Sequence, residues 1–307
     1  MQGIVIRNTG SWYQVRTPEG NFVDCKIKGN FRIKDIKSTN PIAVGDQVVF
    51  DVTKEGEGLI SAIKDRKNYI VRKPTNLSKQ VQIIAANVDQ VLLIVTINYP
   101  ETSTVFIDRF LATCEAYRVP AKIIVNKMDC YSDEELEYLD AFRQLYEQTG
   151  YECFFASATK QQGIEQVKNL LNGKISLLSG NSGVGKSSLI NAVSPELSLR
   201  TGEISASHNK GIHTTTFSEM FELEKNSYVI DTPGIKGFGT IDFQKEEVGH
   251  FFPEIFNVLK KCKFNNCTHI HEPGCAVLKA VAEHRISQSR YQSYLSILED
   301  CDAGKYR

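Results

Sequence analysis

The chain has 307 residues, of which 41% are hydrophobic and 23% charged, as in an ordinary globular protein with room for two or three domains. No apolar run reaches the roughly 18 residues that a membrane helix needs, and the N-terminus lacks a signal-peptide core. We therefore expect a cytoplasmic protein without a membrane segment. The zero net charge is unevenly spread: residues 1–75 hold 13 Lys and Arg against 8 Asp and Glu, a balance of +5. Such an excess fits a polyanionic partner or a merely solvated surface equally well.

The first domain, expected at residues 1–72, has the pattern of a small β-barrel. Apolar and polar residues alternate in part over short runs, and glycine-containing turns separate them. Five or so short strands in about 70 residues suit a barrel of the OB type. OB barrels bind RNA in some proteins and are structural modules in others, and periodicity does not choose between the two. The runs are 3–7, 12–16, 22–27 and 47–51.

Residues 73–240 change to apolar strand-length runs that alternate with helical stretches. Runs that are apolar on both faces are typical of buried strands in an α/β sheet. Ser132 and Glu135 have the spacing of a helix capping box, and apolar residues from Leu139 to Tyr146 then line one helical face. We therefore expect a helix-covered sheet in this domain. The predicted strands are 91–95, 122–125, 153–156, 175–178 and 228–230.

A glycine-rich motif of the form G-x-x-x-x-G-K-[ST] follows the predicted strand 175–178 and precedes a helical stretch. In such a motif glycines let the backbone wrap phosphates at a helix N-terminus. Lys186 would place its charge near the β and γ phosphates, and Ser187 would offer its hydroxyl to Mg²⁺. We name residues 180–188 the phosphate loop. Its members are Gly180, Asn181, Ser182, Gly183, Val184, Gly185, Lys186, Ser187 and Ser188.

A second motif predicts that the base is guanine. The carboxylate of Asp129 can accept hydrogen bonds from both N1–H and the 2-amino group of guanine, a pair that adenine does not offer. Lys127 would lie along the base, and Asn126 would tie this element to the phosphate loop. The dipeptide Ser157-Ala158, after the predicted strand 153–156, would complete the base pocket through its backbone. We name the guanine reader by its residues, Asn126-Lys127-Met128-Asp129.

The sequence Asp231-Thr232-Pro233-Gly234 has the features of a γ-phosphate sensor. Asp231 could hold Mg²⁺ through water, and the Gly234 N–H could contact the γ-phosphate and lose it on hydrolysis. In the polar stretch before it we expect Thr215 to complete the Mg²⁺ shell. Ile235 cannot orient the attacking water, which leaves His213 as a candidate. We therefore expect slow unassisted turnover, on the order of 10⁻⁴–10⁻² per second.

The order of these motifs differs from that of an ordinary GTPase, in which the phosphate loop comes first and the guanine reader late. Here the reader and the Ser-Ala loop precede the phosphate loop, which predicts a circularly permuted GTPase domain. With the segment Gly211-Ile212-His213-Thr214-Thr215-Thr216, nearly the whole chain resembles the small ribosomal subunit biogenesis GTPase family, called RsgA or YjeQ. Many members of that family carry a basic residue where Ile212 stands.

The resemblance implies a late assembly factor that contacts 16S rRNA and proteins of the small subunit. It also implies that the subunit stimulates GTP hydrolysis and that release follows it. A hydrophobic residue in place of the catalytic glutamine, here Ile235, is likewise described for the family.

Residues 241–307 predict a mainly helical domain with a metal site. Cys262, Cys267 and Cys275, with either His269 or His271, supply the ligands of a closed tetrahedral structural zinc site. The family pattern selects His269. Four protein ligands leave no open position for catalysis. A further helical stripe is typical of a core or partner-facing surface, and its members are Tyr291, Tyr294, Leu295 and Leu298.

Our leading hypothesis is a monomeric GTPase that uses Mg²⁺ with GTP, holds one structural Zn²⁺ and works on the small ribosomal subunit. One alternative is a GTP-dependent switch that binds another RNA or protein. A third hypothesis, that the protein is a P-loop kinase, is disfavoured by the presence of the guanine reader. Because the γ-phosphate sensor is joined directly to residues 241–307, loss of the Gly234 contact would be able to move the C-terminal domain as a lever.

Overall fold

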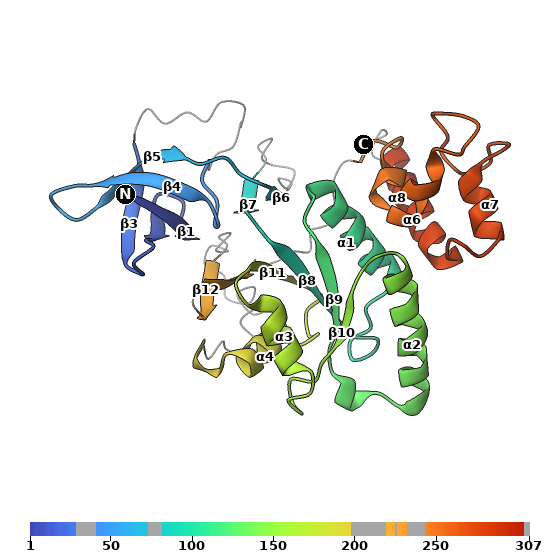
Figure 1. Cartoon of the computed structure of the whole chain (residues 1–307), viewed down its shortest axis with the longest axis horizontal. Helices are drawn as coiled ribbons and strands as arrows, with labels where there is room; N and C mark the ends of the chain where they lie inside the picture. Colours follow the sequence, from blue (N-terminus) through green and yellow to red (C-terminus); the bar gives the residue numbers. More distant parts are fainter. Residues whose placement is uncertain (29–40, 73–81, 198–218, 225, 232–242, 304–307) are drawn as a thin grey trace.

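The computed structural model describes residues 1–28, 41–72, 82–197, 219–224, 226–231 and 243–303. The described residues form a small β-barrel, a central sheet covered by helices and a cluster of C-terminal helices (Figure 1). The barrel and the C-terminal helices lie at opposite ends of the long axis, on either side of the sheet. This three-part fold agrees with the sequence prediction.

The N-terminal barrel closes on itself because its first strand pairs with both its second and its fourth. Its strand order is β1-β2-β3-β5-β4, and β3 runs parallel to β5. In β2, Tyr13 and Val15 point into the core while Gln14 and Arg16 do not, so alternation places every second residue inside. The strands are β1 (Gln2–Asn8), β2 (Tyr13–Arg16), β3 (Phe22–Ile27), β4 (Gln47–Val52) and β5 (Gly58–Ile63).

The central sheet has the order β10-β9-β8-β11-β13-β12, in which only β12 is antiparallel to its neighbour among the described strands. Every residue of β8 is buried because helices cover both faces of the sheet. A hairpin, β6 (Tyr69–Arg72) with β7 (Gln82–Ala86), links barrel and sheet along the chain. The sheet strands are β8 (Gln90–Val95), β9 (Ala121–Val125), β10 (Cys153–Phe155), β11 (Ile175–Ser179), β12 (Glu219–Glu224) and β13 (Ser227–Asp231).

In the described part of the chain, four helices cover the sheet, two on each face. The residues of β8 that alternate along the strand pack in turn on α1 and α2 or on α3 and α4. The predicted capping box is present: Ser132 accepts from the Glu135 N–H, and the Glu135 carboxylate accepts from the Ser132 N–H. The helices are α1 (Thr104–Tyr117), α2 (Asp133–Gln148), α3 (Ile164–Leu171) and α4 (Lys186–Val193).

The barrel is joined to the sheet through β12 and β13. Strand β1 pairs with β12 at Arg7 and Glu219. Arg16 of the barrel donates to Glu222 at 2.8 Å and to the Tyr228 hydroxyl at 2.9 Å. These contacts bind the first domain to β12 and β13 of the central sheet.

The C-terminal domain packs on the opposite side, against α1. Its core includes Ala112 of α1 and the predicted stripe residues Tyr291, Tyr294 and Leu298, which are buried. No helix in the described ranges is long and apolar enough to cross a membrane. The domain contains η4 (Val248–Phe251), α6 (Pro253–Leu259), α7 (Ala276–Ala282) and α8 (Gln288–Ala303).

Candidate nucleotide and metal sites

The predicted nucleotide motifs meet at one edge of the central sheet. The strands β8, β9, β10, β11 and β13 run parallel, so their carboxyl ends lie together. The guanine reader follows β9, the Ser-Ala loop follows β10 and the phosphate loop follows β11. Ligands of open α/β sheets bind at this edge.

The phosphate loop has the backbone that phosphate wrapping requires. Gly185 caps α4 with φ +90°, and a Cβ there would lie 2.5 Å from the Asn126 Nδ2, so only glycine fits. Lys186 donates to the carbonyls of Gly180 and Asn181, each at 2.8 Å. The ammonium therefore lies over the mouth of the loop at the N-terminus of α4, where backbone N–H groups and helix dipole favour an anion. Ser187 is the next residue of this first turn.

The guanine reader presents an ionised, exposed carboxylate. Asp129 accepts from the Ser157 hydroxyl, and from the Thr159 hydroxyl at 2.8 Å. The hydrogen bond from Ser157 is the largest cause that lowers the pKa of Asp129 below its ordinary value. The Ser-Ala loop is thus in contact with the reader through the side chain of Ser157, in addition to the backbone role predicted for it. Thr159 was not predicted, because a single hydroxyl in a loop gives no pattern.

Asn126 joins the two motifs as predicted. Its Nδ2 donates to the Val184 carbonyl of the phosphate loop at 2.9 Å, and the residue is buried. Its own carbonyl accepts from the Tyr131 hydroxyl at 2.7 Å. Met128 N–H donates to the Ala156 carbonyl at 3.2 Å, which holds the reader beside β10.

A further segment, residues 96–103 between β8 and α1, borders both motifs. The Lys127 ammonium donates to the Tyr99 carbonyl at 2.5 Å, and a Cβ on Gly183 would lie 3.4 Å from the ring of Pro100. We name it the 96–103 loop. Its sequence carries no known nucleotide motif, so only the folded chain reveals its position.

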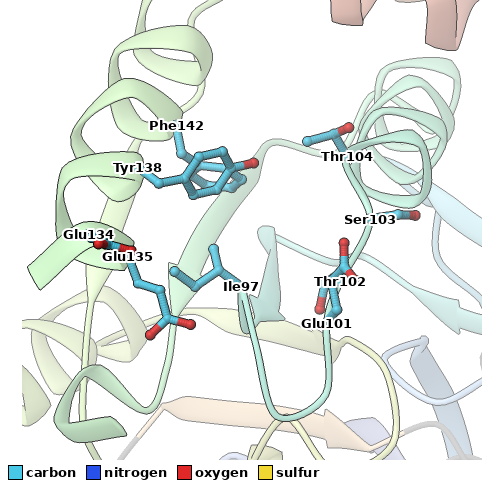
Figure 2. A pocket seen from close by; sticks show the side chains of 9 residues that line it. All are labelled: Ile97, Glu101, Thr102, Ser103, Thr104, Glu134, Glu135, Tyr138 and Phe142. Carbon is cyan, nitrogen blue, oxygen red and sulfur yellow. The ribbon is translucent and has the colours of Figure 1, made fainter. Parts of the chain in front are cut away.

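The other side of the 96–103 loop faces the first turns of α2. Figure 2 shows Ile97 and Glu101 across a cavity of about 350 Å³ from Glu135 and Tyr138. Glu135 accepts from the Asn98 Nδ2 at 2.9 Å while it also closes the capping box. The cavity wall is therefore tied to both the helix and the loop.

The switch residues fall mostly outside the described part of the chain. Asp231 ends strand β13, next to β11 and hence at the same sheet edge as the phosphate loop. The roles predicted for the remaining residues stay predictions. Those residues are His213, Thr214, Thr215, Thr216, Gly234 and Ile235.

The C-terminal domain gathers four potential metal ligands, Cys262, Cys267, His269 and Cys275, whose ligand atoms all lie within 4.8 Å of one another. Two Zn–S bonds of about 2.3 Å at a tetrahedral angle separate the sulfurs by about 3.8 Å. The Sγ atoms of Cys262 and Cys275 are 3.9 Å apart, and the His269 Nδ1 lies 3.4 Å from the Cys275 Sγ. His271 is exposed and outside the cluster, so the geometry favours His269.

Burial affects the imidazole and the thiols of this cluster in opposite senses: it favours the metal-binding form of His269 and disfavours the thiolate form of Cys267. Burial lowers the pKa of His269, which keeps its ring neutral, and raises the pKa of Cys267 to about 12. Thiols in this state must release protons when a metal binds. The remaining cysteines lie outside the cluster and form no disulfide, and they are Cys25, Cys114, Cys130, Cys153 and Cys301.

Glu272 organises the loop that carries His269. Its carboxylate accepts from the N–H groups of Thr268 at 2.5 Å, Ile270 at 2.9 Å and His271 at 3.1 Å. Burial alone would raise the pKa of Glu272, but the hydrogen bonds from Thr268 and the backbone lower it to about 2.

The substitution Glu272→Gln is expected to weaken metal retention by about 10–100-fold, as loss of a supporting contact does at other metal sites. The amide carries no charge and turns one acceptor into a donor that faces backbone N–H groups. Competition with a chromophoric chelator measures the affinity. Glu283→Gln is the matched control, because Glu283 pairs only with surface cations in the described structure. Equal affinities in the two variants would contradict the role of Glu272.

Comparisons with known proteins agree with this geometry. The RsgA GTPase family matches residues 63–241, and the RsgA N-terminal domain matches residues 2–60. The chain is 63% identical over 307 residues to a protein of Phocaeicola vulgatus named small ribosomal subunit biogenesis GTPase RsgA, with 100% of this chain and 99% of the relative covered. The chain belongs to the RsgA GTPase family.

Two solved structures extend the likeness to RsgA over the whole fold. YjeQ from Thermotoga maritima has a TM-score of 0.80 at 34% identity, with 98% of each chain covered. YloQ, described as a circularly permuted GTPase, has a TM-score of 0.79 at 30% identity, with 100% of this chain and 96% of the other covered. The circular permutation predicted from motif order is therefore confirmed, and so is the assignment to the RsgA family.

Proposed function

We infer that this chain is a GTPase that assists assembly of the small ribosomal subunit. The observation that carries the proposal is its 63% identity, over its full length, to a protein named for that function. The meeting of the phosphate loop and guanine reader supports GTP as the nucleotide. The proposed partners are 16S rRNA and proteins of the subunit, and the proposed location is the cytoplasm.

The site residues of this proposal follow from the sequence motifs and their positions. Asp129 selects guanine, Lys186 contacts the β and γ phosphates, and Ser187 with Thr215 holds Mg²⁺. Asp231 contacts the magnesium through water. One zinc ion bound by the four-ligand cluster stabilises the C-terminal domain. The domains are 1–72, 73–240 and 241–307.

The decisive experiment measures GTP turnover with and without purified small subunits. We expect the subunits to raise turnover by on the order of 10–10³-fold, within the roughly 10⁵-fold that partners supply to other GTPases. Lys186→Ala should lose activity under both conditions, because the transferred phosphate loses its cation. Large subunits serve as the specificity control.

A GTP-dependent switch for another partner is the alternative. This alternative predicts that GTP binds tightly but that small subunits leave GTP turnover unchanged. That outcome would contradict the proposed ribosomal function and would still be consistent with the nucleotide site.

A further inference from the structure

A buried ionic cluster joins α1 of the GTPase domain to the C-terminal domain. Arg290 of α8 donates to the Asp108 Oδ1 on α1 at 2.8 Å and to both carboxylate oxygens of Glu254 on α6, at 2.7 and 3.1 Å. Asp108 and Arg290 are each 1% exposed. The Tyr146 hydroxyl of α2 donates to the same Asp108 oxygen at 2.9 Å. Charges buried this deeply hold a fixed geometry, because a shift would leave one of them unpaired.

A second contact closes the rim of the same interface. Arg109, the next residue of α1, donates to the Ser296 carbonyl at 3.0 Å and hydroxyl at 2.8 Å, and it pairs with Asp300. All three of these acceptor atoms belong to residues of α8. Two consecutive side chains of α1, Asp108 and Arg109, therefore bind α8. Ala112, one turn further along α1, is buried in the core of the C-terminal domain and extends the same interface.

The 96–103 loop leads into the N-terminus of α1. Ser103 caps α1 by accepting from the Phe106 N–H, which fixes the loop to the helix. Inside the loop, Thr96 and Thr102 exchange hydrogen bonds, and the Thr96 hydroxyl donates to the Pro100 carbonyl at 2.5 Å. The loop is thus a closed unit that leads directly into the interface helix.

The same loop contacts the nucleotide motifs at two points. Its Tyr99 carbonyl accepts from the Lys127 ammonium, and its Pro100 ring borders Gly183 of the phosphate loop, where a Cβ would lie 3.4 Å from the ring. Tyr99 holds φ +58°, a strained conformation for a residue with a side chain. In this conformation the Tyr99 carbonyl accepts from Lys127 of the guanine reader.

We propose that Arg109 and Arg290 are positioning residues for guanine nucleotide, and that nucleotide and C-terminal domain stabilise one another through the 96–103 loop and α1. The inference rests on the proposed guanine reader. Guanine would immobilise Lys127, the lysine would hold the Tyr99 carbonyl, and α1 would present Asp108 and Arg109 to α8. Binding that orders one end of such a unit lowers the cost of ordering the other.

This route differs from a lever driven by the γ-phosphate sensor. The 96–103 loop lies beside Lys127 of the guanine reader and Gly183 of the phosphate loop, two regions that would serve GDP and GTP alike. The coupling therefore operates with either nucleotide, whereas a lever at Gly234 distinguishes them. The C-terminal domain would stay docked after hydrolysis and loosen when the nucleotide leaves.

Hydrogen exchange of α8 in the full-length, zinc-loaded protein tests the proposal. GDP and a non-hydrolysable GTP analogue are each expected to slow exchange over residues 288–301 by about fivefold or more, the lower range of typical coupling. Protection by the GTP analogue alone would assign the coupling to the γ-phosphate sensor and overturn the proposal. No protection by either nucleotide would overturn it as well.

Reciprocity supplies the second measurement. Arg109→Ala loosens the rim but leaves the buried cluster intact, and it is expected to raise the Kd of GDP by about fivefold. Arg285→Ala is the control, since Arg285 lies in the same domain and its side chain pairs with Glu283 away from α1. Arg290→Met should raise the Kd of GDP by more than Arg109→Ala does, provided that the variant folds. If it does not fold, Arg109→Ala alone decides the test.

The two proposals fail separately. Tight GDP binding with unchanged Kd in Arg109→Ala would overturn the coupling and leave the GTPase assignment standing. Absence of GDP binding in the unaltered protein would overturn the nucleotide site itself. Retained zinc content in Arg109→Ala confirms that its effect does not arise from an unfolded C-terminal domain.

Discussion

Replacing Asp129 with asparagine is expected to lower GTP affinity by about 10²–10⁴ and to favour xanthosine triphosphate. The carboxylate would accept two hydrogen bonds from guanine, and bonds to a charged group contribute about 1.5–3 kcal/mol each. At about 1.4 kcal/mol per tenfold, their loss accounts for that range. Xanthine carries a carbonyl where guanine carries its 2-amino group, so the amide of asparagine can donate to it.

The described geometry makes this a clean substitution. Asp129 is exposed, and its neighbours Ser157 and Thr159 are hydroxyls that can either donate or accept. An asparagine at this position therefore keeps its hydrogen-bond partners, and the fold should be little affected. The effect should concentrate on base recognition.

Titration with fluorescent GDP, competed by GTP and by xanthosine triphosphate, measures the change. Asp133→Asn is the matched control, because this exposed carboxylate lies in the first turn of α2, four residues further on. If Asp129→Asn kept the original preference for GTP, Asp129 would not be the base-reading residue.

The sequence predicted the parts of the molecule that repeat a local pattern. The capping box at Ser132, the strand before the phosphate loop and the buried stripe on α8 all appear in the structure. Each depends on residues within one or two turns or one strand, where spacing reports which face is buried. Motif order likewise revealed the permutation, because order along the chain needs no coordinates.

The features that were not predicted depend on distant residues. Asp108 and Arg290 are separated by 182 positions, and neither stands in a recognisable motif. As isolated charges in amphipathic helices they resemble surface residues, yet both are buried. The contact between Lys127 and Tyr99 was also not predictable from the sequence. The acceptor is a backbone carbonyl, which every residue has, so the residue type at position 99 does not indicate the bond.

Removing the metal is expected to unfold the C-terminal domain. About 60 residues form a marginal core on their own, and structural zinc contributes an apparent binding free energy of about 10–16 kcal/mol in small domains. Cys275 belongs to the cluster and is also the N-cap of α7, since its Sγ accepts from the Leu278 N–H. Cys275→Ser therefore weakens a ligand and the start of a helix together.

The expected result is separable from an effect on the central sheet. Chelation or Cys275→Ser should expose the C-terminal domain to limited proteolysis while the barrel and sheet resist it, because their cores do not include the cluster. Cys301→Ser is the control, since this cysteine lies in the same domain outside the cluster and donates to the Phe243 carbonyl. Native mass spectrometry gives the zinc content of each variant.

Two outcomes would contradict the structural role of the metal. One is a zinc-free protein whose C-terminal domain resists protease as the loaded protein does. The other is equal proteolysis of Cys275→Ser and Cys301→Ser. If the domain does unfold, the buried ionic cluster loses both Glu254 and Arg290 of α8. GDP affinity should then fall at the same chelator concentration as protease resistance. Coincidence of those two midpoints would join the metal, the interface and the nucleotide in one equilibrium.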